Sequence, residues 1–168
     1  MNLFKFISNI TGSNPLDCMC DDTFLSDAHC SIMRLISAVS SIEEILSNKY
    51  FYVTSNSSEH LIMKKVGLMN AIVHEMTFLI HQIDGTIQDC NKRRVEKGLK
   101  SYSPSFAKLK SRNCNIDNKY KNNEVSISKI ILKLLQSEFF DDLKKHHDGY
   151  TRAELNLKNW CQQIIGME

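Results

Sequence analysis

The feature that most constrains this chain is an apolar stripe that runs from Ile62 to Ile87. Its members recur at alternating steps of four and three residues, which places them along one side of a helix. A strand does not have this period, because its side chains repeat every two residues. The stripe consists of Ile62, Val66, Met69, Val73, Met76, Ile80, Ile83 and Ile87. We therefore predict a long helix over residues 58–97, at the centre of a helical bundle.

Three other segments show the same helical period, and local signals predict where they begin and end. We expect Ser26 to cap the helix that follows it, and Thr151 with Glu154 to form a capping box. Asp148-Gly149 is expected to be a turn, and Gly98 is expected to end the long helix in the left-handed conformation. The predicted additional helices are 26–47, 125–147 and 151–165.

The length of 168 residues is typical of one domain, and the composition is that of a soluble globular protein. We predict an all-α fold, a single helical domain over 1–168 that forms an antiparallel bundle of four main helices with additional short helices. Residues 1–24 are expected to be an N-terminal arm or loop, and 99–123 a basic, partly mobile connection. No run of 18 or more apolar residues occurs, so we expect no membrane span.

The charge of the chain is unevenly distributed. Ten basic residues lie between Lys92 and Lys121 against only Glu96 and Asp117, so this segment has a net charge of +8. The whole chain has a net charge of +2, which leaves −6 for the remainder. A basic segment of this kind binds an acidic protein surface, binds nucleic-acid phosphates, or is only a solvated face. The basic residues are Lys92, Arg93, Arg94, Lys97, Lys100, Lys108, Lys110, Arg112, Lys119 and Lys121.

The six cysteines are scattered along the chain and form no recognisable disulfide framework. The N-terminal segment has Lys5 within its apolar part and polar residues from Ser8, which does not fit a secretory signal. We therefore expect a cytoplasmic protein with reduced thiols. Cys18, Cys20, His29 and Cys30 supply residue types that bind zinc, but Cys-x-Cys is not the usual zinc spacing. We predict no metal and no cofactor, and keep these four residues as an alternative zinc site.

His146-His147-Asp148 is the most suggestive short motif, because it lies at a predicted helix end where side chains reach solvent. The helix dipole is expected to favour a charged histidine there. The triplet and the helix after it resemble HEPN domains, helical bundles often found as ribonucleases in bacterial defence and toxin–antitoxin systems. That resemblance implies proton transfer by His146 or His147. The arginine of the motif is absent, since its expected positions carry Phe139, Phe140, Asp141 and Asp142.

No complete catalytic constellation is evident, so we favour binding over catalysis. The predicted function is a small intracellular protein-binding module of the inhibitor, immunity or antitoxin type, with an acidic protein surface as its partner. The alternative is a HEPN-like domain that binds or cleaves RNA with residues 92–121 and with His146 and His147. A homodimer formed through the long apolar stripe is a further alternative.

Overall fold

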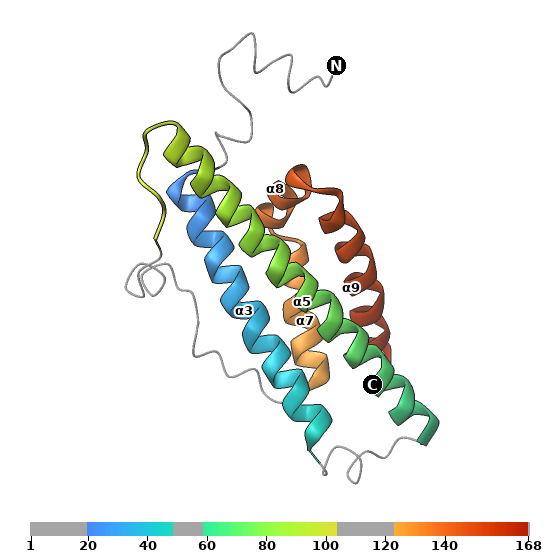
Figure 1. The fold of residues 1–168 in the computed structure, drawn as a ribbon. Helices are drawn as coiled ribbons and strands as arrows, with labels where there is room; N and C mark the ends of the chain where they lie inside the picture. Colours follow the sequence, from blue (N-terminus) through green and yellow to red (C-terminus); the bar gives the residue numbers. More distant parts are fainter. Residues whose placement is uncertain (1–19, 49–58, 104–122, 168) are drawn as a thin grey trace.

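The computed structural model of the chain describes residues 20–48, 59–103 and 123–167. These residues contain five helices and no strand, which confirms the all-α prediction (Figure 1). Most of the predicted N-terminal arm and most of the predicted basic connection lie outside the described residues. The helices are α3 (Asp22–Ser47), α5 (Glu59–Glu96), α7 (Glu124–Leu135), α8 (Glu138–His146) and α9 (Asp148–Gly166).

The four longer helices lie side by side, and α8 lies across one end of them (Figure 1). α3 packs against α5 and α7, and α9 packs against the same two helices. α3 and α9 run in one direction, whereas α5 and α7 run in the other (Figure 1). α5 and α7 are thus consecutive in the chain but parallel, so they need the long connection that the sequence provides between them. No helix in the described part of the chain is long and apolar enough to cross a membrane.

The long central helix matches its prediction closely, because α5 spans Glu59–Glu96. Gly98 has a φ of 77°, and two backbone hydrogen bonds close the helix end there. The amide of Gly98 donates to the carbonyl of Val95 at 3.0 Å, and the amide of Leu99 donates to the carbonyl of Arg94 at 2.8 Å. This arrangement is a Schellman motif, in which glycine adopts the left-handed conformation with little strain.

The predicted helix over 125–147 is wrong as one element, because it is divided into α7 and α8. Ser137 makes the break by bonding to the backbone on both sides. Its hydroxyl donates to the carbonyl of Leu134 at 2.7 Å and accepts from the amide of Phe140 at 3.2 Å, which caps α8. Serine competes with helical hydrogen bonds in this way, and apolar periodicity alone does not reveal it. Because α8 begins anew after this break, the side chains of Phe140 and Leu143 are buried in the core.

Two predicted N-caps are also wrong. α3 begins earlier than predicted, with Asp21 as its N-cap accepting from the amide of Phe24 at 2.8 Å. Ser26 is instead buried within the helix, where its hydroxyl is bonded by that of Tyr102. α9 begins before Thr151, because the imidazole of His147 caps it by accepting from the amide of Gly149 at 2.9 Å. The predicted turn at Asp148-Gly149 is therefore the first turn of α9.

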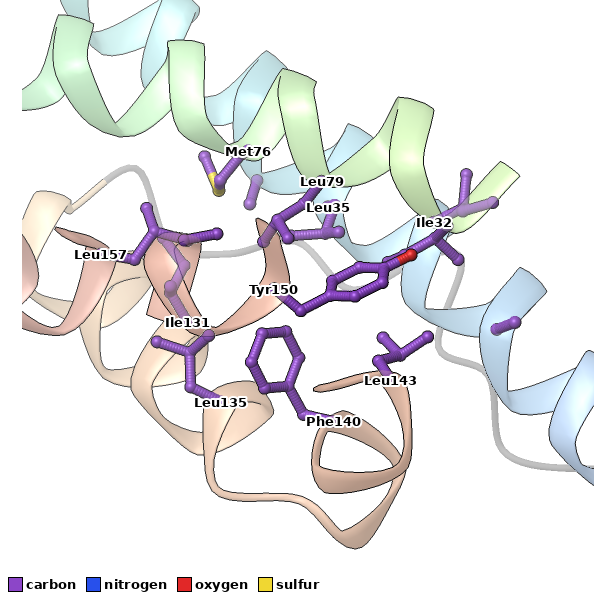
Figure 2. Packing of buried hydrophobic residues seen from close by; sticks show 14 of the residues in the cluster. Ile32, Leu35, Met76, Leu79, Ile131, Leu135, Phe140, Leu143, Tyr150 and Leu157 are labelled. Carbon is purple, nitrogen blue, oxygen red and sulfur yellow. The ribbon is translucent and has the colours of Figure 1, made fainter. Parts of the chain in front are cut away.

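The core fills the space between all five helices (Figure 2). Tyr150 and Phe140 are the bulkiest fully buried side chains and meet edge to face, with ring centroids 6.2 Å apart. On α5 the buried face is turned slightly from the predicted stripe, since Ile72 and Leu79 are buried while Val73 and Ile80 are only partly covered. α5 packs against both α3 and α9, so two adjoining faces of the helix contribute to the core.

Candidate functional site

One end of the bundle brings together several of the residues that the sequence singles out. We call it the disulfide end, because Cys20 before α3 is bonded there to Cys90 on α5. The two Cα atoms are 5.3 Å apart, and the bond closes a sequence separation of 70 residues. Cys30 is disulfide-bonded as well, whereas Cys161 is a free, buried thiol. The prediction of reduced thiols is therefore wrong for Cys20, Cys90 and Cys30.

The alternative zinc ligands are not brought together as thiolates. Zinc binds the deprotonated thiol, and the sulfur atoms of Cys20 and Cys30 are engaged in disulfide bonds. His29 lies within α3, half-buried, and Cys18 lies outside the described residues. No group of three or more potential ligands occurs among the residues that the structure describes.

The disulfide end is fastened by polar contacts as well as by the disulfide. Arg94 donates to the backbone carbonyls of Lys100 at 3.0 Å and Cys20 at 3.2 Å, and to the carboxylate of Asp22 at 2.9 Å. The side chain of Asn91 exchanges two hydrogen bonds with the backbone of Tyr102. These contacts hold the segment after α5 against the start of α3.

The predicted basic residues divide into three groups. Arg93 and Arg94 are partly buried, and Arg94 serves mainly to hold the backbone together. Lys92, Lys97 and Lys100 are exposed to solvent. The remaining five lie outside the described residues, and these are Lys108, Lys110, Arg112, Lys119 and Lys121.

A groove of about 360 Å³ lies between the start of α3 and the end of α5. We call it the basic groove, since Arg93, Arg94 and Lys97 contribute its cations. Leu99 adds an apolar side chain that is 57% exposed, and Val95 is exposed to the same extent on the last turn of α5. The groove is lined by Cys20, Asp21, Asp22, Arg93, Arg94, Lys97 and Leu99.

A smaller cleft of about 170 Å³ adjoins the basic groove, and Cys20 and Arg93 belong to both. We call it the histidine cleft. One wall is a face of α5, and the other is the junction between α8 and α9, which supplies two adjacent histidines. The cleft is lined by Cys20, Gln82, Gly85, Thr86, Asp89, Cys90, Arg93, His146 and His147.

His146 and His147 differ in their surroundings. The ring of His146 stacks on Phe24, with centroids 5.4 Å apart, and its Nε2 atom is buried without a hydrogen-bond partner in the described structure. Burial and, next, the nearby charge of Arg93 lower the pKa of His146, while Asp142 and Asp89 have smaller effects that raise it. The charged form expected from the helix dipole is thus disfavoured. His147 is exposed and uses its Nδ1 atom to cap α9.

The structure places an arginine near the two histidines. Arg93 lies in the same cleft as His146 and His147, although it belongs to α5 and precedes His146 by 53 positions in the printed sequence. Sequence spacing could not reveal this proximity, because it depends on how the junction between α8 and α9 lies against α5 in the folded protein. The Cys20–Cys90 pairing was missed for the same reason.

No protein-family model matches this chain, and neither does any curated protein or solved structure.

Proposed function

We propose that the protein is a non-catalytic, protein-binding module that contacts an acidic partner through the basic groove. The observation that carries this proposal is the combination of exposed apolar and cationic side chains at one place. Leu99 is 57% exposed in the groove that Arg93 and Lys97 also line. Apolar side chains gain free energy when a partner covers them, and the cations select a partner of opposite charge.

The rigidity of the surrounding structure supports this proposal. We infer that α3, α5, α7 and α9 act as one antiparallel bundle, which serves as a firm scaffold. The disulfide, Arg94 and Asn91 fasten the groove to that scaffold. A surface that is already ordered loses less conformational entropy when it binds, so more of the contact energy appears as affinity.

The disulfide bonds bear on where the protein acts. The cytoplasmic location expected from the sequence rested on an N-terminal segment that does not fit a secretory signal, and it implied reduced thiols, whereas disulfides persist mainly in oxidising compartments. We therefore propose that this module meets its partner in an oxidising compartment. An inhibitor or immunity-type role is compatible with that environment.

Charge reversal in the groove tests the proposal. Lys97→Glu/Lys100→Glu reverses the exposed charge of Lys97 in the groove and that of Lys100, the residue after Leu99. Lys129→Glu/Lys158→Glu reverses two exposed charges on α7 and α9 as a control with the same net charge. Partners captured from the protein's own host should be lost with the first variant and retained with the second. Cross-links to the partner should form at Lys97 and Lys100. Retention of every partner by both variants would contradict the proposal.

A second candidate function is RNA cleavage, and one observation favours it. Arg93 lines the histidine cleft with His146 and His147, so a phosphate-binding cation accompanies two groups that can transfer protons. Labelled RNA incubated with the wild-type protein would then be cleaved, and His146→Ala/His147→Ala would abolish the cleavage. Intact RNA with the wild-type protein at both low and moderate salt would exclude this candidate.

A further inference from the structure

The histidine cleft contains a glycine that neither the backbone nor the packing requires. Gly85 lies inside α5, where glycine destabilises a helix relative to alanine. Its φ is not positive, and a Cβ atom built on it would meet nothing within 4 Å. Gly85 lines the cleft together with His146 and Arg93, so the absence of a side chain there leaves space in the cleft.

The polar groups of the cleft are unequally satisfied. The hydroxyl of Thr86 contacts the carbonyl of Gln82 and the hydroxyl of Tyr150. The Nδ1 atom of His147 accepts from the helix backbone. The Nε2 atom of His146, in contrast, is buried without a partner among the described residues. A buried polar atom in this state loses its bonds to water without replacement, so a bound group that supplies an oxygen would be stabilised there.

Size and charge restrict what the cleft can hold. Its volume of about 170 Å³ is below the range of roughly 300–1,000 Å³ that small-molecule pockets occupy, and suits a single side chain. Arg93 contributes a positive charge from α5, and Asp89 on the same helix contributes a negative one. Asp142 on α8 also acts on His146, and Phe24 contributes no charge from α3. Asp142 does not line the cleft, so with His146 protonated the lining carries Arg93 and His146 against Asp89, a net positive charge that attracts an anion.

We propose that the histidine cleft receives one carboxylate side chain of the acidic partner, bound by Arg93 and by the protonated imidazole of His146. This inference rests on the proposed function and specifies the chemistry of one contact. Arg93 joins the cleft to the basic groove, so a partner on the groove can place an acidic side chain in the cleft. Binding is coupled to proton uptake, because the carboxylate offsets the charge of Arg93 that disfavours protonated His146.

Acetate is the probe, since it presents the carboxylate without the partner. The pKa of His146 is followed by NMR of the imidazole in the full chain, with 100 mM sodium acetate or 100 mM sodium chloride. We expect acetate to raise the pKa of His146 by at least about half a pH unit. Arg93→Gln should abolish the acetate-dependent rise, because it removes the cation that the carboxylate contacts.

Glycine substitutions supply a matched pair of controls. Gly85→Leu should fill the cleft and abolish the acetate effect, whereas Gly67→Leu, on an exposed part of the same helix, should preserve it. Thermal unfolding confirms that each variant is folded. If Gly85→Leu does not fold, Gly85→Ala provides a milder change at the same position.

The proposal is overturned if acetate leaves the pKa of His146 unchanged in the wild type, or if Gly85→Leu retains the full effect. A larger rise with phosphate than with acetate would overturn the carboxylate assignment and favour RNA phosphate instead. Because the measurement uses no partner, it remains informative even if charge reversal at Lys97 and Lys100 fails to affect partner capture.

Discussion

Asn91 on α5 and Tyr102 exchange two hydrogen bonds across the segment that follows the helix. The side-chain amide of Asn91 donates to the carbonyl of Tyr102 at 3.1 Å, and the amide of Tyr102 donates to the side-chain oxygen of Asn91 at 2.7 Å. The hydroxyl of Tyr102 then reaches Ser26 on α3 at 3.2 Å. Leu99 and Lys100 lie between Asn91 and Tyr102 in the chain, so this contact helps to position the basic groove.

Replacement of Asn91 by alanine should destabilise the fold by about 1–3 kcal/mol, because the backbone amide and carbonyl of Tyr102 lose their partners. Urea unfolding measures the change. Gln88→Ala is the control, since the exposed side chain of Gln88 bonds to Asp84 on the same helix. It should cost less than about 0.5 kcal/mol. Equal effects of the two substitutions would contradict the structural role of Asn91.

The Cys20–Cys90 disulfide should contribute about 4 kcal/mol to stability, given the 70-residue separation that it closes. We expect Cys20→Ser/Cys90→Ser to lower the free energy of unfolding by about this amount, mainly because the unfolded chain gains conformational freedom. Chemical denaturation without reductant tests the effect. Peptide mapping of the wild-type protein should recover Cys20 and Cys90 in one linked pair, and free thiols at both positions would refute the pairing.

Cys161 should be unreactive in the folded protein. Burial raises the pKa of its thiol to about 12, so almost no thiolate is present at neutral pH. Iodoacetamide at pH 8 should label Cys161 only after denaturation, at a rate that follows global unfolding. Rapid labelling under native conditions would show that α9 opens locally.

Substitution of Gly149 by alanine should destabilise the start of α9. A Cβ atom there would lie 2.8 Å from the Nδ1 atom of His147, which must then move away from its capping position. Loss of an N-cap costs about 1 kcal/mol. Gly166→Ala is the matched control at the other end of α9, where a Cβ atom would meet nothing within 4 Å. Thermal unfolding should show a lower melting temperature for Gly149→Ala and no lower melting temperature for Gly166→Ala.

Stability should depend on the protonation of His146. Burial and Arg93 lower its pKa in the folded state below the ordinary value of 6.5, so the unfolded state binds the proton more tightly. The contribution of neutral His146 to stability is therefore complete above pH 6.5 and is lost as the pH falls through the lowered pKa. His146→Gln should weaken this dependence when the free energy of unfolding is measured between pH 5 and 8. An identical pH profile in the variant would contradict the assignment.

Much of the helical architecture follows from local patterns. The period of the apolar residues predicted an all-α fold and the bounds of α5, because a helix with one apolar face must bury that face. Gly98 predicted the end of α5, since few other residues adopt the left-handed conformation at low cost. The break at Ser137 and the caps at Asp21 and His147 were missed, because several polar residues near each end could have served equally well.

The sequence by itself determined the class of the fold, because helical periodicity and glycine conformation are properties of neighbouring residues. Only the tertiary structure decided which residues meet at the disulfide end. Cys20 with Cys90, and Arg93 with His146, come from distant parts of the chain. Their proximity depends on the packing of α3, α5 and α8 around a shared core, and no spacing within one helix encodes that geometry.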